Sequence, residues 1–490
     1  MSDLKRTKTT TLSDKRVGMY STVLKTFKSN YFILPLIFIL GLIIRSINLE
    51  YSSFDLDDAY SIYYTHASWE HLSKILSIDI NPPTYYITLF TWFKLVGESV
   101  FNARFLSVLF SALSGVFIWL IVARQVSKKA AFIAILLFLL SNYQLSISLL
   151  VRSFAMSQLF AIISFYYFLE IYSNPKKSNV IFYILSTSLL LNIHQTTFLI
   201  PLIQFTLLFF YKWDAKKRIT ILISQGVVLL SLVPQVLSFK ANKQESLNQW
   251  RVAPNVDEFW DVLASVAGGL NMLYCYIIAM LVAVVLVFKN KKDKKILLTI
   301  LAWLILGFGL AFIVSQKIPF FLPKYLSFLS PAFYILMGVV FSYLFLFNKW
   351  WSTLILIPII YSSLQLNYHS KRLENWKKVV PMATKINQNG YDVLVSPVYM
   401  YRPFTYYFDK TIFNKVDSIM PIMYHQHGIY FSSIIDTHFF DYRFPKKIVL
   451  VQSQKGHVDP HQENIKVLNY FFPYHVKKSV DGIDLHLYKR

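Results

Sequence analysis

Apolar runs of about 20 residues recur along most of this chain, and they constrain its fold more than any other feature. A helix of about that length crosses the hydrocarbon core of a bilayer. Of the 490 residues, 55% are hydrophobic and only 15% are charged, whereas about a quarter of the residues in a typical soluble domain are charged. The sequence therefore predicts a mainly α, polytopic helical membrane protein.

The basic residues lie where turns between membrane helices are expected. The net charge is +23, and Lys and Arg form short clusters between the apolar runs, as at Lys128-Lys129, Lys176-Lys177 and Lys216-Lys217-Arg218. Such clusters mark cytoplasmic turns because insertion retains positive charge on the inner side. They also interact with anionic lipid. The distribution thus indicates membrane topology and argues against a nucleic-acid partner.

When successive turns are assigned alternately to the inner and the outer side of the membrane, the chain has about eleven predicted transmembrane helices. Residues 1–30 are expected to form a basic cytoplasmic N-terminus, and the first apolar run lacks a small-residue cleavage motif, which favours a retained span over a signal peptide. Residues 31–368 then form the transmembrane region. The expected spans are 31–49, 101–123, 130–149, 153–172, 179–193, 195–211, 219–238, 269–288, 296–315, 326–347 and 351–367.

Segment 50–100 is expected as the first outer loop because it is acidic and contains few cations. Within it, residues 84–96 are aromatic but short and interrupted by Lys94, so we expect an interfacial helix there. If residues 84–96 were counted as a membrane span, every later turn would be assigned to the opposite side of the membrane. The loop carries the cluster Asp55-Leu56-Asp57-Asp58 directly after the first span. Acids so close to a membrane are costly unless they meet water, a cation or a substrate.

Residues 369–490 have a different character from the apolar region. Short β-like runs at 393–395, 448–451 and 483–488 follow a helical pattern at 371–386. These patterns predict a small α/β domain, and the alternation of turns places it outside the membrane. No glycine-rich loop opens a helix after a strand, so a nucleotide-binding fold is unsupported.

The predicted topology also places several unusual polar residues together on the outer side of the membrane. They are Asp57 and Asp58 in the first loop, Asn81 before a Pro-Pro pair, and, between later spans, Arg152, His194, Lys317 and Lys324. Carboxylates suit a general base and cations suit a phosphate. Together these residues suit attack on a phosphate-linked lipid held in the bilayer.

Several short motifs resemble those of the GT-C glycosyltransferases, in particular the bacterial relatives of the protein O-mannosyltransferases and aminoarabinose transferases. The likeness extends from about residue 40 to the end of the chain. Its specificity comes from the order and spacing of the motifs. They are Asp57-Asp58-Ala59, Pro82-Pro83-Thr84-Tyr85-Tyr86, Ala103-Arg104-Phe105-Leu106-Ser107, Arg152-Ser153-Phe154-Ala155, His194-Gln195-Thr196, Pro323-Lys324-Tyr325-Leu326, Asn375-Trp376-Lys377 and Tyr391-Asp392-Val393-Leu394-Val395-Ser396-Pro397.

The resemblance implies a polyprenyl-phosphate-linked sugar as donor, transferred with inversion to an acceptor hydroxyl on a protein, lipid or glycan. It implies that Asp57 is the catalytic base and that Asp58 orients the acceptor or the base. Donor-phosphate binding is expected of Arg152, Lys324, Lys317 and Tyr325. The substrate cavity is expected to include Asn81, Tyr85, Arg104 and His194. The expected location is the bacterial inner (plasma) membrane, as a multi-pass protein with its C-terminal domain extracytoplasmic.

Other readings of the same residues stay open. No cofactor is required by the implied reaction, although Asp57 and Asp58 are also compatible with a divalent cation. The Asp cluster is equally typical of a helix N-terminus. A polytopic lipid or solute transporter with an outer accessory domain is the alternative function, and it would use polar residues within the spans, such as Gln144 and Gln225. A non-enzymatic scaffold would leave the acidic cluster unexplained.

Overall fold

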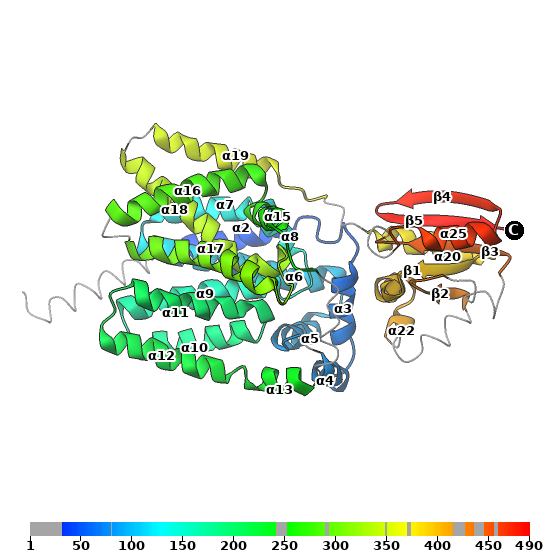
Figure 1. The fold of residues 1–490 in the computed structure, drawn as a ribbon, viewed down its shortest axis with the longest axis horizontal. Coiled ribbons are helices and arrows are strands. Elements are labelled where there is room, and N and C mark those ends of the chain that lie inside the picture. The colour runs from blue at the N-terminus through cyan, green and yellow to red at the C-terminus, as the bar shows by residue number, and fades with distance from the viewer. Residues whose placement is uncertain are drawn as a thin grey trace, which may run out of the picture.

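The fold was analysed in a computed structural model, which places a helical body at one end and a smaller sheet unit at the other (Figure 1). The structure describes residues 32–79, 81–241, 252–289, 294–347, 350–369, 374–414, 427–435, 445–454 and 459–490. The predicted cytoplasmic segment 1–30 lies outside these residues. We use "helical body" for residues 32–369 and "sheet unit" for residues 374–490.

The helical body follows the predicted succession of apolar runs. The helical body begins with α2 (Ile33–Ser46) and the first-loop helices. The described helices that follow are α6 (Val100–Gln125), α7 (Lys128–Leu139), α8 (Asn142–Ser148), α9 (Phe154–Ser173), α10 (Lys177–Leu191), η1 (Gln195–Phe198), α11 (Leu199–Phe210), α12 (Ala215–Leu230), α13 (Val233–Ala241), α15 (Val256–Ala267), α16 (Leu270–Lys289), α17 (Lys294–Ser315), η2 (Lys324–Leu329), α18 (Pro331–Phe347), η3 (Trp351–Ile355) and α19 (Leu356–Leu364). Their apolar side chains form one continuous core.

Five helical segments of the described chain are long and apolar enough to cross a membrane. They are Val100–Gln125, Phe154–Ser173, Leu270–Lys289, Lys294–Ser315 and Lys324–Phe345. The pair α7 and α8 adds a sixth only as a bent unit, because the two helices meet at 63°. The segment predicted as a span, 130–149, is therefore a bent pair of helices. Other predicted spans, such as α2 and α10, are apolar helices of 10–17 residues, so the count of eleven stays a prediction.

The first loop folds into three short helices, α3 (Leu56–Thr65), α4 (Trp69–Ile78) and α5 (Thr84–Val96). Side chains cap the first two: Asp55 accepts a hydrogen bond from the backbone of Asp58, and Ser68 accepts one from His71. Such caps satisfy orphan N–H groups at a helix start. The helix expected over 84–96 is present as α5, while its interfacial position stays a prediction.

The sheet unit contains a five-stranded sheet in the order β2-β1-β3-β5-β4. The strands are β1 (Asp392–Ser396), β2 (Ile429–Phe431), β3 (Lys447–Gln452), β4 (Tyr474–Val480) and β5 (Ile483–Lys489). β1 is parallel to both β2 and β3, and β5 is antiparallel to β3 and β4. Three of these strands, β1, β3 and β5, lie where the sequence predicts them. The helices are α20 (Trp376–Gln388), η4 (Val398–Met400), α21 (Tyr401–Phe408), α22 (Lys410–Phe413) and α25 (Glu463–Phe471).

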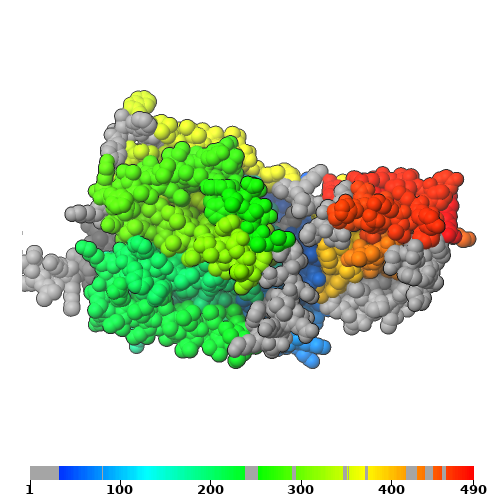
Figure 2. Space-filling view, viewed as in Figure 1, coloured from blue at the N-terminus to red at the C-terminus, as the bar shows by residue number. Residues whose placement is uncertain are grey.

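The sheet unit packs on the first-loop helices, which Figure 2 shows in blue between the green helical body and the orange and red sheet unit. One apolar cluster combines side chains of α3 and α5 with side chains of α20, α21 and the sheet. The guanidinium of Arg402 in α21 lies 3.8 Å from the ring centroid of Tyr60 in α3. The backbone N–H of Phe54 donates to the Tyr407 hydroxyl at 2.8 Å. These contacts fix α3 between the two parts of the molecule.

Candidate active site

A cavity of about 1140 Å³ lies where the first loop, the helical body and the sheet unit meet. Its walls come from α3, the Asn81-Pro82 turn, α5, α8, the turn before α9, the segments around His194 and Lys324, and three residues of the sheet unit. Typical ligand pockets measure about 300–1,000 Å³. The cavity is thus large enough for more than one small ligand group.

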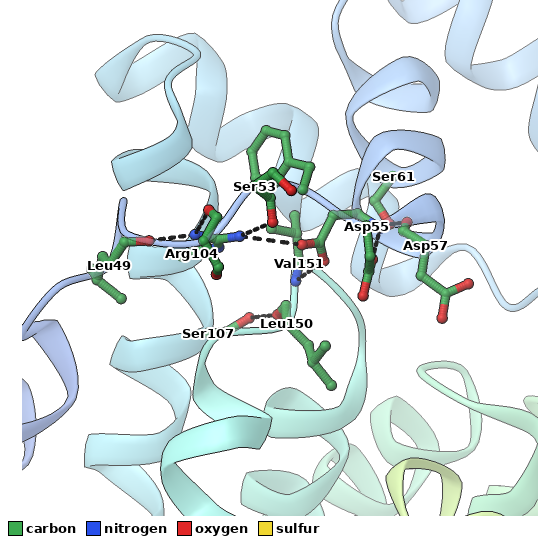
Figure 3. Close-up of polar contacts among 12 residues, drawn as sticks. Leu49, Ser53, Asp55, Asp57, Ser61, Arg104, Ser107, Leu150 and Val151 are labelled. Atoms are coloured by element: carbon green, nitrogen blue, oxygen red, sulfur yellow. Dashed lines mark hydrogen bonds and ion pairs between the residues drawn. The ribbon is translucent and has the colours of Figure 1, made fainter. Parts of the chain in front are cut away.

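Asp57 and Asp58 are adjacent in the first turn of α3 but point to different sides of the helix. Successive residues of a helix are separated by about 100° around its axis. The Asp57 side chain is 28% exposed and lines the cavity, whereas the Asp58 side chain is 0% exposed. In Figure 3 the Asp57 carboxylate points away from Arg104. Of the pair, therefore, only Asp57 faces the cavity.

Two cations from distant segments meet the Asp57 carboxylate. Lys324 Nζ donates to Asp57 Oδ2 in a short ion pair, and Arg152 Nη2 lies 3.6 Å from Asp57 Oδ1. Arg152 also donates to the Tyr86 hydroxyl at 3.0 Å. The side chains of Arg152 and Lys324 are 16% and 36% exposed. At this point of the cavity the Asp57 carboxylate thus meets two cationic groups, a combination expected from the sequence.

Asp58 has a different position from the one expected of a substrate-contacting acid. Its Oδ1 accepts the backbone N–H of Val151 at 2.8 Å, and its Oδ2 lies 3.7 Å from Arg104 Nη2. It does not line the cavity. Because Val151 directly precedes Arg152, the buried Asp58 carboxylate holds the α8–α9 turn against α3. Asp58 therefore holds the turn that carries Arg152, and its side chain does not reach the cavity where an acceptor contact was expected.

Arg104 is likewise buried and does not line the cavity, contrary to its expected place there. Its guanidinium donates to the carbonyl oxygens of Leu49, Ser52 and Ser53, the last two at 2.9 Å (Figure 3). Buried charges require such partners because desolvation is costly. Arg104 thus fixes the chain between α2 and α3. The sequence motif that contains it marks a structural anchor of the site.

The remaining predicted residues divide between the cavity wall and positions away from it. Asn81, His194 and Tyr325 line the cavity. Tyr85 is 1% exposed and Lys317 is exposed to solvent, and neither lines the cavity. Tyr85 precedes the lining residue Tyr86 and points into the core because neighbouring helix positions differ in direction. Lys317 follows α17 and lies before the turn that brings Lys324 inward.

His194 lies at the start of η1, against the segment that carries Lys324. Its Nδ1 lies 2.8 Å from the Thr196 hydroxyl, which donates to the carbonyl of Tyr325 at 2.9 Å. Burial, together with the positive charges of Arg152 and Lys324, lowers the pKa of His194 to about 3. The imidazole is therefore neutral at physiological pH. It supports the Lys324 segment without adding a third positive charge to the cavity.

Some lining residues are not identified by the sequence analysis. Tyr60 and Tyr64 lie three and seven residues after Asp57, a spacing that puts all three on one face of α3, and each lines the cavity. That spacing is a usable sequence signal. The sheet unit contributes Glu374, Tyr399 and Gln454. Their sequence positions give no such signal, because only the packing of the sheet unit on α3 brings them to the cavity.

The acidic pair does not fit a two-carboxylate metal site. Asp57 faces Lys324 and Arg152, while Asp58 faces Val151 and Arg104 on the other side of α3. Within the described ranges, no group of three or more His, Cys, Asp or Glu side chains is arranged to hold a metal ion. The residues present therefore do not support the cation considered for Asp57 and Asp58.

Comparisons with known proteins identify the fold. Residues 81–238 match the family described as dolichyl-phosphate-mannose-protein mannosyltransferase. The chain is similar to the apo structure of ArnT from Cupriavidus metallidurans, with a TM-score of 0.59 at 12% identity over 92% of this chain and 97% of that one. The chain has the GT-C fold. The fold-level resemblance inferred from the motifs is thereby confirmed.

Two further solved structures share this fold. The ArnT structure bound to undecaprenyl phosphate matches with a TM-score of 0.58 at 12% identity, covering 92% of this chain and 97% of that one. The apo oligosaccharyltransferase of Archaeoglobus fulgidus matches with a TM-score of 0.54 at 10% identity, covering 88% of this chain and 70% of that one. Another structure of this archaeal enzyme contains Zn and sulfate. A comparison with curated protein sequences finds no match.

Proposed function

We propose that this GT-C protein is a membrane glycosyltransferase that moves a sugar from a polyprenyl-phosphate donor to an acceptor hydroxyl. The observation that carries the proposal is the meeting of Asp57 with Arg152 and Lys324 at one cavity. A carboxylate can accept the acceptor proton, and two cations can hold a departing phosphate. The match to the mannosyltransferase family and the likeness to ArnT bound to undecaprenyl phosphate support the lipid-linked donor.

The reaction transfers one proton and exchanges one bond at the anomeric carbon. Asp57 takes the proton of the acceptor hydroxyl while the oxygen of that hydroxyl forms a bond to the anomeric carbon. The bond from that carbon to the phosphate oxygen breaks, and its electron pair leaves with the polyprenyl phosphate. Attack opposite the leaving group inverts the configuration. A positioned base contributes about 10²–10⁴-fold to the rate.

The donor phosphate competes with Asp57 for the same two cations. In the structure, Asp57 forms an ion pair with Lys324, and its Oδ1 lies 3.6 Å from Arg152 Nη2. A phosphate with its greater charge and additional acceptor oxygens draws Lys324 and Arg152 away from the carboxylate. Donor binding thus frees Asp57 to act as a base. Tyr325, which follows Lys324 and lines the cavity, lies beside this phosphate position.

The lining next to the charged groups is apolar and suits the first isoprene units of the donor. The residues concerned are Leu145, Ile147, Leu149, Phe154, Ile193 and Phe320. They come from α8, the start of α9 and the segments that flank η1 and η2. Burial of apolar area contributes about 25 cal/mol per Å². A prenyl chain beside a bound phosphate therefore adds affinity that a water-soluble sugar phosphate lacks.

The topology remains part of the proposal. With the eleven predicted spans, the transmembrane region 31–368 and the outer domain 369–490, we propose that the cavity opens on the outer face of a bacterial inner membrane. Transport is the weaker alternative in this arrangement. Gln144 and Gln225, which a transport path within the spans would use, are buried and donate to Ser330 and to the carbonyl of Pro201.

Binding of undecaprenyl phosphate to the purified protein in detergent tests the donor site. Lys324→Ala and Arg152→Ala are each expected to weaken binding by about tenfold or more, equivalent to about 1.4 kcal/mol. Asp57→Asn is expected to strengthen it, because the competing charge is removed. Lys317→Ala is the matched control, since this exposed lysine lies off the cavity, and its affinity should equal that of the wild type.

Undecaprenol, which lacks the phosphate, provides the second control in the same titration. It should bind weakly and equally to all of these variants. If the wild type, Lys324→Ala and Arg152→Ala bind undecaprenyl phosphate with equal affinity, neither Lys324 nor Arg152 contributes to donor binding. Weaker binding by Asp57→Asn would contradict the competition between Asp57 and phosphate.

A further inference from the structure

The sheet unit presents a set of polar side chains to the cavity. Tyr399 lies in η4, which follows β1, and Gln454 lies two residues after the end of β3. β1 and β3 are adjacent and parallel, so their carboxyl ends open on the same edge of the sheet. In open sheets of this type, ligands bind outside the carboxyl ends of the parallel strands. Here that edge faces the cavity that contains Asp57.

The contacts among these side chains form a connected polar wall. The Tyr399 hydroxyl donates to Gln454 Oε1 at 2.9 Å. Glu374, which lies just before α20, accepts a hydrogen bond from the Trp376 indole at 3.0 Å. Burial raises the pKa of Glu374, and the charge of Asp55 raises it further, although bonds from Trp376 and Gln454 oppose the rise. Glu374, Tyr399 and Gln454 line the same cavity as Asp55 at the start of α3.

The backbone at Gln454 is held in an unusual conformation. Its φ is +46°, a left-handed value that few residues other than glycine adopt and that costs free energy in an ordinary position. Such conformations concentrate at functional sites, where surrounding structure holds them. In this conformation, the Gln454 amide lies beside Tyr399 at the cavity wall.

The cavity lining includes two sets of polar groups. Arg152 and Lys324 meet Asp57, and the region lined by Asp55, Glu374, Tyr399, Gln454 and the aromatic ring of Tyr60 belongs to the same cavity. Carboxyl, amide and phenol groups hydrogen-bond to hydroxyls, and an aromatic ring offers an apolar face to a sugar ring. Asp55 disfavours an anionic ligand by like-charge repulsion, and burial, which raises the pKa of Glu374, favours its uncharged, hydrogen-bonding form. This region therefore suits an uncharged, hydroxyl-rich molecule.

We propose that Asp55, Tyr60, Glu374, Tyr399 and Gln454 form the acceptor subsite and that the acceptor is a neutral glycan. The assignment rests on the proposed glycosyltransferase function, and it gives the sheet unit a direct part in substrate recognition. Asp55 lies two residues before Asp57 on the chain. A sugar hydroxyl held by this subsite is thus delivered toward the proposed base, while Arg152 and Lys324 hold the donor phosphate.

Saturation-transfer NMR on the full-length protein in nanodiscs tests the subsite. The probes are neutral oligosaccharides of glucose, mannose and N-acetylglucosamine, and the same oligosaccharides carrying one phosphate. Neutral probes are expected to bind, and phosphorylation is expected to weaken binding about tenfold or more. Absence of binding by every neutral probe, or equal binding of the phosphorylated forms, overturns the proposal.

Three conservative variants locate the binding. Glu374→Gln and Tyr399→Phe preserve shape, and Gln454→Gly preserves the left-handed backbone while it removes the amide. Each is expected to weaken neutral-probe binding several-fold and to leave the affinity for undecaprenyl phosphate unchanged. Glu463→Gln makes the same chemical change on the exposed α25 and should have no effect.

The two ligands separate failure of the subsite from failure of the proposed function. Unchanged probe binding in all three variants overturns the subsite while undecaprenyl phosphate still binds at the donor position. A loss of undecaprenyl phosphate affinity in Glu374→Gln and Gln454→Gly assigns these residues to the donor and also overturns the subsite. A wild-type protein that binds neutral probes but not undecaprenyl phosphate contradicts the donor assignment alone.

Discussion

At the residue scale, two adjacent aspartates have opposite environments. Asp57 faces the cavity and two cations, whereas Asp58 is fully buried between Arg104 and the backbone of Val151. The sequence analysis identifies both aspartates as candidate site residues and expects both of them to act at the substrate. Their separation depends on how α3 packs against α6 and the α8–α9 turn, which no local pattern in the sequence specifies.

The burial of Asp58 leads to a stability prediction. Asp58→Asn leaves Arg104 with a buried charge that has lost its carboxylate, and breaking such a pair costs about 3–5 kcal/mol. Asp57→Asn removes a carboxylate that is 28% exposed, and its two cationic partners, Arg152 and Lys324, are 16% and 36% exposed, so solvent replaces part of the lost interaction. Thermal unfolding in detergent should therefore show a much larger loss of stability for Asp58→Asn than for Asp57→Asn. Equal unfolding temperatures of Asp58→Asn and Asp57→Asn would show that the buried Asp58 carboxylate does not stabilise the fold more than Asp57 does.

At the element scale, close helix approach depends on particular small residues. Gly338 in α18 lies against α7, where an added Cβ would meet the Ala130 carbonyl oxygen and would lie 2.9 Å from Ala134 Cβ. Small residues allow membrane helices to approach this closely. Gly309 in α17 has nothing within 4 Å of the equivalent Cβ position. The two glycines thus form a matched pair with different surroundings.

This pair gives a packing prediction. Gly338→Ala is expected to lower the unfolding temperature because overpacking costs about 1–3 kcal/mol. Gly309→Ala should leave it unchanged or raise it slightly, since alanine is favoured over glycine within a helix by about 1 kcal/mol. Thermal unfolding of both variants in the same detergent makes the comparison. A Gly338→Ala protein as stable as Gly309→Ala would show that α7 and α18 are not closely packed.

Much of the element structure is predictable from the sequence, and the exceptions have physical reasons. Apolar runs of about 20 residues locate most helices, and short β-like runs locate β1, β3 and β5. The bend between α7 and α8 is missed because Ser141 and Asn142 interrupt hydrogen bonding within a run that is apolar overall; Ser141 caps the new helix by accepting from Gln144. Strand β2 has only three residues, too few for a periodic signal.

At the scale of the whole molecule, the site is built from segments that are far apart in the sequence. Asp57, Arg152 and Lys324 are identified in advance because the alternation of turns and the motif resemblance both place them together. Glu374, Tyr399 and Gln454 are missed because their approach to the cavity depends on docking of the sheet unit onto α3. Long-range packing of this kind has no signature in a single sequence.

The topology of the whole molecule is testable with cysteine labelling. Cys275 is the only cysteine, so Cys275→Ser provides a background without thiols. Tyr470→Cys places a thiol on the sheet unit at a position that is 83% exposed, and Lys212→Cys places one in the basic turn between α11 and α12. A membrane-impermeant maleimide on intact spheroplasts should label only Tyr470→Cys. Labelling of Lys212→Cys but not Tyr470→Cys would reverse the proposed orientation.

The central claim is that Asp57 is the base of a sugar transfer to the cell envelope. Mass spectrometry of envelope glycans from cells that lack the gene, complemented with either the wild-type gene or Asp57→Asn, tests it most directly. The wild type should restore a sugar-sized mass increment that the Asp57→Asn protein, present in the membrane at equal amount, does not restore. Restoration of that increment by Asp57→Asn would contradict the account.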